Sequence, residues 1–128
     1  MPRKPSKTFT DREMEIMRVI WRLGEASARQ IQESLPGDRH YNTVMTIIRV
    51  LERKNHLIHR EEGRTHMYRA AQSQKKSRNR VVRHLVKHVF GGSAASLVLN
   101  LVETGDLNSR DLDEIRKKMA ALKETKTP

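Results

Sequence analysis

Apolar residues recur at helical spacing in two stretches near the start of the chain. Before the first stretch, Thr10 and Glu13 have the residue types and the spacing of a capping box, which marks a helix N-terminus. The apolar pattern stops at Gly24, a residue type common at helix ends. A second capping-box pattern starts at Ser27, and the Pro-Gly turn signal at residues 36–37 ends the stretch that follows it. The sequence therefore predicts one helix after each capping box.

A third helix is predicted from about Asn42 to Lys54, and its two faces differ in character. At about 100° per residue, one face gathers four aliphatic side chains: Val44, Ile47, Ile48 and Leu51. The opposite face and its edges carry Asn42, Thr43, Met45, Thr46, Arg49 and Arg53. An ordinary solvated face mixes glutamate with lysine, whereas this face has no acidic residue until Glu52. The pattern indicates a helix that buries one side and offers short polar groups and arginines on the other.

Two short segments rich in strand-forming residues come next. Residues 57–60 and 65–69 flank a glycine-containing turn at residues 61–64, and this order predicts a β-hairpin. Three helices followed by a hairpin is the layout of a winged helix-turn-helix. The expected fold class is therefore mostly α with a small β-hairpin.

The last third of the chain carries more apolar surface than it can bury alone. After a polar and basic stretch at residues 72–80, the pattern predicts three short helices separated by Gly91-Gly92 and by Gly105. A segment of about 45 residues is too small for so much apolar surface, so we expect it to pack against a second copy of the chain. The residues predicted to form this dimer interface are Val82, Leu85, Val89, Phe90, Leu97, Leu101, Ile115 and Met119.

The charge of the chain is unevenly distributed. The net charge is +11, and residues 1–80 contribute +9 of it, with 18 Lys and Arg against 9 Asp and Glu. Residues 81–128 contribute only +2, with 8 basic against 6 acidic side chains. This asymmetry favours an N-terminal part that binds a polyanion and a C-terminal part with another role. Ribosomal proteins and membrane-surface binders are also basic, so the charge by itself does not identify the polyanion.

Several classes of protein are disfavoured by what the sequence lacks. It has no cysteine, which excludes disulfides, zinc fingers and thiol chemistry. No apolar run approaches the roughly 18–20 residues that cross a bilayer, and no secretory segment follows the basic start, so we expect a cytoplasmic protein without membrane insertion. Neither a phosphate-binding glycine loop nor a nucleophile elbow is present, so we expect no enzyme activity.

One histidine pair raises the question of a metal site. His84 and His88 are four residues apart on a predicted helix, a spacing that allows two ligands to one ion. No third ligand is tied to this pair in the sequence, so surface or interface histidines are the better interpretation, and we expect no metal or other cofactor. A metal-dependent enzyme or sensor is the alternative hypothesis for this pair.

DNA recognition fits the third predicted helix. A recognition helix buries one side in its own domain and presents the other to the major groove, where short polar groups reach base edges and arginines reach phosphates. The hairpin adds Arg60 and Arg64, which could bind phosphates beside the groove, although the negative charges of Glu61 and Glu62 would act against this. The predicted DNA-binding residues are Asn42, Thr43, Thr46, Arg49, Arg53, Arg60 and Arg64.

The order and spacing of these motifs resemble the penicillinase repressors of the BlaI/MecI type, a family of winged-helix regulators. The resemblance runs from about Phe9 to Met119. The motifs that carry it are residues 10–17 with Trp21, residues 27–31, residues 42–48 with Leu51 and Lys54, residues 63–64 with Tyr68, and residues 90–93 with 96–100. Two positions depart from the family pattern: Val50 replaces a common arginine, and Asn55 replaces a helix-stopping glycine.

The resemblance implies more than the residues alone do. It implies a dimer that binds a two-fold operator and blocks transcription, with Thr43 and Thr46 at DNA-contacting positions. It also implies a membrane-bound sensor protease as a partner and a candidate cleavage site at Asn100 and Leu101, where Leu101 replaces the usual aromatic residue.

These inferences define a domain organisation and a function for the chain. We expect a flexible basic arm over residues 1–9, for which a merely solubilising terminus is an equal alternative. A winged-helix DNA-binding domain over residues 10–72, a helical dimerisation domain over residues 73–123 and a frayed tail over residues 124–128 complete the organisation. The predicted function is that of a dimeric, sequence-specific transcriptional repressor that binds double-stranded DNA. The alternative is a nonspecific architectural DNA-binding protein.

Overall fold

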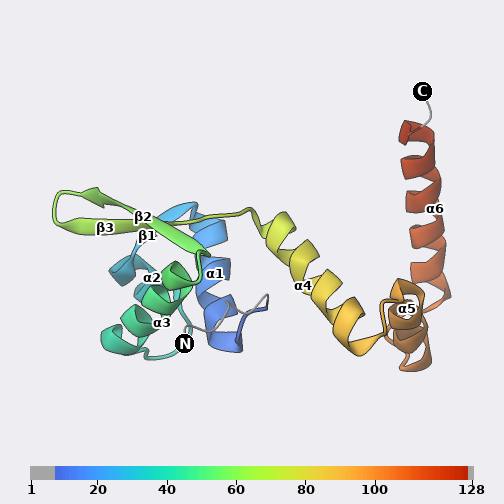
Figure 1. Cartoon of the computed structure of the whole chain (residues 1–128), viewed down its shortest axis with the longest axis horizontal. Helices are drawn as coiled ribbons and strands as arrows, with labels where there is room; N and C mark the ends of the chain where they lie inside the picture. Colours follow the sequence, from blue (N-terminus) through green and yellow to red (C-terminus); the bar gives the residue numbers. More distant parts are fainter. Residues whose placement is uncertain (1–7, 127–128) are drawn as a thin grey trace. The chain divides into compact units, whose positions relative to one another are not determined.

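Three helices and a small sheet form the N-terminal part of the chain. The structure is a computed structural model that describes residues 8–126 (Figure 1). Most of the predicted arm, residues 1–7, lies outside the described residues. The elements of this part, in order, are α1 Asp11–Leu23, β1 Glu25–Ser27, α2 Ala28–Ser34, α3 Tyr41–Arg53, β2 Leu57–Glu62 and β3 Thr65–Ala70. The predicted order of three helices and a hairpin is confirmed, with one additional strand.

Both predicted capping boxes are present. The Oγ1 atom of Thr10 accepts a hydrogen bond from the backbone N–H of Glu13 at 3.1 Å, and the Glu13 carboxylate accepts one from the N–H of Thr10 at 2.8 Å. Ser27 and Gln30 make the equivalent pair of bonds at the start of α2, at 3.2 and 2.8 Å. Because each box satisfies two N–H groups that the first turn leaves free, the sequence fixes where both helices begin.

The sheet contains one strand that the sequence pattern did not predict. Its order is β1-β3-β2, with both neighbouring pairs antiparallel. In β1, Ala26 lies opposite Tyr68 of β3, and both side chains are buried. A three-residue strand is too short to show a periodicity, so only its pairing with β3 reveals it.

The hairpin turn is tighter than predicted. Glu61 and Glu62, expected in the turn, belong to β2, and Glu62 pairs with Thr65. The turn is reduced to Gly63 and Arg64, and Gly63 has a φ of 64°. The prediction of a four-residue turn was therefore wrong, because a glycine with positive φ lets two residues reverse the chain and extends the ladder.

One apolar core holds this part together. α1 packs against α3 and β3, and α2 packs against α3. The largest fully buried side chains are Ile16, Met17, Ile20, Ile31, Val44, Ile48, Leu51 and Leu57. Every helix of this part contributes to the list, so the core fixes the orientation of α3 relative to the other two helices.

Three further helices form the C-terminal part, and they bury very little. They are α4 Gln74–Val89, α5 Ala94–Glu103 and α6 Ser109–Lys126. Ser93 caps α5 by accepting a hydrogen bond from the N–H of Ser96 at 3.1 Å. α6 continues to Lys126, into the segment predicted to be a tail. Between residues 78 and 124, no residue is buried.

The chain divides into two compact units later than the sequence indicated. The units are residues 1–84 and 85–128, so the division falls within α4 and not at the predicted boundary between residues 72 and 73. Residues 74–84 of α4 belong to the first unit. In this segment Ser77 is buried and the Arg80 guanidinium lies 5.8 Å from the ring centre of Phe9. The polar and basic stretch at residues 72–80 is therefore helical from Gln74 onward, and it contributes the buried Ser77 to the first unit.

Candidate nucleic-acid interface

α3 has the two faces that its sequence pattern predicted. Val44, Ile48 and Leu51 are at most 1% exposed and belong to the core. The five residues predicted to contact DNA from this helix are all exposed: Asn42, Thr43, Thr46, Arg49 and Arg53. No ion pair engages either arginine within residues 8–126. The outer face of α3 therefore presents polar and cationic groups with unused bonding capacity.

A local hydrogen bond sets the chemistry of Thr46. Its hydroxyl donates to the backbone carbonyl of Asn42, one turn earlier, at 2.9 Å. A hydroxyl has one proton to donate and two lone pairs to accept with. Thr46 is thus left as a hydrogen-bond acceptor toward any group that approaches α3 from outside.

Ion pairs attach both ends of α3 to α1. Beyond the C-terminal end, the Lys54 ammonium lies 3.0 Å from the carboxylate of Glu13, whose side chain is only 5% exposed. Before the N-terminal end, Arg39 pairs with Glu15 at 2.9 Å. Burial raises the pKa of Glu13, but hydrogen bonds from the Thr10 backbone and from Lys54 lower it more, so the pKa lies below its ordinary value. These links hold α3 in place before any ligand binds.

The two arginines predicted to act from the hairpin have different environments. Arg60 makes a bidentate pair with Glu25, at 2.6 and 2.9 Å, and a further contact with Glu62 at 3.0 Å. Arg64 lies exposed in the turn, and no ion pair engages it in the described part of the chain. The charge of Arg60 is therefore already balanced, whereas that of Arg64 is available to a polyanion.

A histidine pair connects the hairpin to α3. The rings of His59 and His66 stack with their centres 4.3 Å apart and their planes 7° from parallel, on the side of the sheet that carries Tyr68. His59 contacts the carboxylate of Glu52 in the last turn of α3, and His66 lies 3.5 Å from Glu61. The sequence pattern does not reveal this stack, because the stack depends on strand register.

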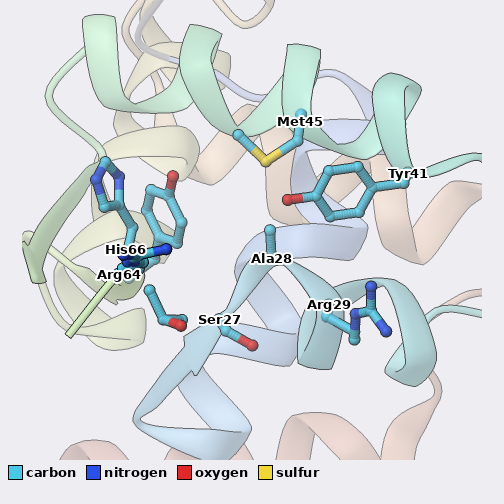
Figure 2. A pocket seen from close by; sticks show the side chains of 9 residues that line it. Ser27, Ala28, Arg29, Tyr41, Met45, Arg64 and His66 are labelled. Atoms are coloured by element: carbon cyan, nitrogen blue, oxygen red, sulfur yellow. The ribbon is translucent and has the colours of Figure 1, made fainter. Parts of the chain in front are cut away.

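A pocket of about 430 Å³ opens between α3, the start of α2 and the hairpin. Tyr41 and Met45 reach into it from α3, Arg64 and His66 stand on the hairpin side, and Ala28 lies at its base (Figure 2). The remaining residues that line it are Ser27, Arg29, Thr65 and Tyr68. Of the predicted site residues, only Arg64 lines this pocket. Sequence reasoning did not single out Arg29 and Tyr41, because their chemistry appears only when α2 and α3 are placed side by side.

The residues predicted to form a dimer interface are accessible to different degrees. Val82, Leu85, Val89, Ile115 and Met119 are exposed, with Val89 at 65% and Met119 at 64%. The other three, Phe90, Leu97 and Leu101, are half-buried. Large apolar side chains that were not predicted are exposed as well: Val98, Leu99, Val102 and Leu122.

Two further features of the described residues bear on the alternatives. Residues 8–126 contain no group of three or more His, Cys, Asp or Glu side chains arranged to hold a metal ion. Within the same residues, no single helix is long and apolar enough to cross a membrane, although α4 and α5 reach that length and apolarity when taken together. The predicted cleavage position, Asn100 and Leu101, lies within α5.

Known proteins resemble this chain over most of its length. A family model described as penicillinase repressor matches residues 9–121. The methicillin resistance regulatory protein MecI of Mammaliicoccus sciuri is 28% identical over 115 residues, which cover 87% of this chain and 94% of that protein. The penicillinase repressor of Bacillus licheniformis is 24% identical over 109 residues, which cover 84% of this chain and 85% of that protein.

A solved structure resembles the N-terminal part. It is the solution structure of the DNA binding domain of the repressor BlaI, which superposes with a TM-score of 0.50 at 26% identity. The match covers 58% of this chain and 90% of that domain. The predicted winged-helix fold class is thereby confirmed.

Proposed function

The chain belongs to the penicillinase repressor family, and we propose on this premise that it is a cytoplasmic homodimer that binds a two-fold DNA operator and represses transcription. It is a DNA-binding repressor and not an enzyme. The observation that carries the operator proposal is the outer face of α3, which is exposed, free of carboxylates before Glu52 and fixed at both ends to α1.

The side chains of this face divide into base-reading and phosphate-binding groups. Asn42 can bind adenine through its amide, and Arg49 can bind either guanine or phosphate. Thr46 acts as an acceptor, because its proton is held by the Asn42 carbonyl, and it therefore suits the amino group of adenine or cytosine. Sequence-specific binding through α3 follows from this combination.

A second copy of the chain is the proposed partner for the C-terminal helices. Residues 78–124 include many large aliphatic side chains, yet no residue among them is buried. Exposing contiguous apolar surface is costly in water, and a self-complementary interface removes it on both chains at once. Such a dimer presents two α3 helices to half-sites about 34–36 Å apart, one turn of DNA.

Release from DNA by proteolysis is the proposed route of induction. A cut between Asn100 and Leu101 would sever α5 and detach α6, which carries the exposed Ile115 and Met119. Loss of this apolar surface weakens the dimer, and a weaker dimer loses the advantage of binding two half-sites together. A membrane-bound sensor protease is the proposed partner for this step.

Selection of duplexes from a random pool by the full-length chain tests the operator proposal. We expect enrichment of a palindromic site with half-sites one helical turn apart. Thr46→Ala should then weaken binding by roughly 5- to 150-fold for each half-site of the selected DNA, since one good base contact is worth about 1–3 kcal/mol. Binding of the same variant to scrambled DNA should change much less.

Thr46→Ser provides the matched control, because it keeps the hydroxyl and removes only the methyl group. It should retain most of the affinity for the selected site if the hydroxyl is the acceptor. Equal losses on selected and scrambled DNA for Thr46→Ala would contradict the role in base reading. A pool that yields no enriched sequence would instead support the nonspecific architectural protein, the second candidate that the net charge of +9 over residues 1–80 favours.

A further inference from the structure

The pocket between α3, α2 and the hairpin has a defined distribution of charge. Arg29 lies on one side of it and Arg64 on the opposite side, with Ala28 and Met45 between them (Figure 2). Within residues 8–126, no ion pair occupies either guanidinium. The pocket thus has two cationic ends and an apolar middle.

The lining of this pocket differs from that of its neighbours. The described residues that line it include two arginines and a histidine but no carboxylate. A second pocket that also borders Arg29 contains Glu33 and Glu62, and a third contains Glu33 and Asp38. Carboxylates repel a bound anion, so among these three the pocket beside α3 is the one suited to anionic ligands.

We propose that this pocket holds the sugar-phosphate backbone of one operator strand, with Arg29 and Arg64 each binding a phosphate and Tyr41 forming part of the wall on α3. The inference rests on the proposed function, and it adds Arg29 and Tyr41 to the DNA-binding surface. A deoxyribose flanked by two phosphates has the same order as the pocket: charge, apolar group, charge. Arginine is the residue best shaped to bind phosphate oxygens in pairs.

Tyr41 occupies the position where it can contribute in two ways. It is the first residue of α3, the residue is 45% exposed, and in Figure 2 its hydroxyl points into the pocket near Met45. The ring supplies an apolar wall for the sugar, and the hydroxyl can donate a hydrogen bond to a phosphate oxygen. Because Tyr41 also begins the helix that enters the groove, a backbone held here would set how deep α3 lies.

The location of the pocket favours a DNA strand over a small free anion. It adjoins both the exposed face of α3 and the hairpin turn, so a duplex that receives α3 in its major groove passes a strand across its opening. The pocket is also larger than one phosphate group requires and has an apolar centre. A free anion would leave this centre unoccupied.

Salt titrations of DNA binding provide the first test. Each phosphate contact contributes about 0.9 to the slope of log K against log salt concentration. The proposed dimer makes this contact once per subunit, so Arg29→Gln should reduce the slope by about 1.8 on selected and scrambled DNA alike. Tyr41→Phe should weaken binding severalfold on both duplexes with little change in slope, because the lost group is uncharged. Arg18→Gln, which removes one charge from the exposed face of α1, is the control and should leave the slope unchanged. An unchanged slope for Arg29→Gln would overturn the proposal.

Neutral methylphosphonate linkages, placed one at a time in the selected duplex, locate the contact. At several positions the linkage should weaken wild-type binding, and Arg29→Gln should be insensitive at one of them in each half-site. Additive effects at every position would overturn the assignment. Binding of inorganic phosphate that depends on Arg29 and that the selected duplex does not displace would show a free-anion site and would also overturn it. If a palindrome is enriched but Arg29→Gln leaves the salt slope unchanged, only this inference is contradicted. If Arg29→Gln lowers the salt slope but no sequence is enriched, only the proposed operator is contradicted.

Discussion

At the scale of single residues, Glu13 combines two structural roles. Its carboxylate completes the capping box of α1 and pairs with Lys54, the residue that follows α3. The side chain is almost fully buried, so its charge is stabilised only by these partners. Glu13 therefore links the start of the first helix to the end of the helix proposed to read DNA.

The stability contributed by Glu13 should depend on pH. Because its pKa lies below the ordinary value of 4.5, the contribution is present above that value and is lost as the pH falls through the lower pKa of the folded state. Glu13→Gln keeps an oxygen for the capping box but loses the charge, and it should reduce the free energy of unfolding by about 1–2 kcal/mol at pH 7. Urea unfolding at fixed protein concentration should show this difference shrinking below pH 4.

Glu15→Gln is the matched control for this prediction. Glu15 pairs with Arg39 on the surface, where both side chains are more than a quarter exposed, so its loss should cost less than about 1 kcal/mol. A destabilisation by Glu13→Gln that stays constant from pH 7 to pH 3 would show that the ion pair is not its cause.

At the scale of elements, the hairpin carries two arginines that differ in their ion pairing. Arg60 faces the side of the sheet that carries Glu25, and its guanidinium is bound to two carboxylates. Those hydrogen bonds raise the pKa of Arg60 and lower the pKa of Glu25, as expected for a charge pair. Arg64, in the turn, forms no ion pair within the described residues, so its guanidinium can bind a phosphate of DNA.

This difference predicts separate effects on DNA binding. Arg64→Ala should reduce the slope of log K against log salt concentration by about 1.8, the value of one phosphate contact from each subunit of the proposed dimer. The double change of Arg60→Gln with Glu25→Gln removes a pair of opposite charges and should leave the slope unchanged. If the double variant lowered the slope as much as Arg64→Ala does, Arg60 would have to leave its carboxylates and bind phosphate.

At the scale of the whole molecule, the chain has one well-buried core and one set of helices without a core. Among the residues that the structure describes, all buried apolar residues lie at or before Tyr68, whereas α5 has none and the last helix exposes Met119 and Leu122. Residues with this much uncovered apolar surface are stabilised by association, so the fold of the second unit and the oligomeric state should be linked.

A charge on the apolar face of α6 should separate the subunits. Met119→Glu removes apolar burial worth about 1.5–3 kcal/mol per chain and places a charge in the interface, so we expect the dimer dissociation constant to rise at least tenfold. Ala121→Glu, on another face of the same helix, is the control and should leave it nearly unchanged. Sedimentation velocity over a concentration series measures both. Binding to a single half-site should be unaffected in either variant, and an unchanged dimer in Met119→Glu would contradict the proposed interface.

The sequence by itself determined the features that depend on neighbouring residues. The capping boxes at Thr10 and Ser27 fixed two helix starts, and the spacing of Val44, Ile48 and Leu51 fixed which side of α3 is buried. These signals are local, because a helix brings together residues only three or four positions apart.

Only the tertiary structure decided the features that depend on distant residues. The strand β1 exists because Ala26 meets Tyr68, and Arg60 is neutralised because strand register places it beside Glu25. The pocket that pairs Arg29 with Arg64 likewise requires α2 and the hairpin to lie beside α3. Such contacts carry no periodic signal in the chain, since they arise from how the core packs the elements together.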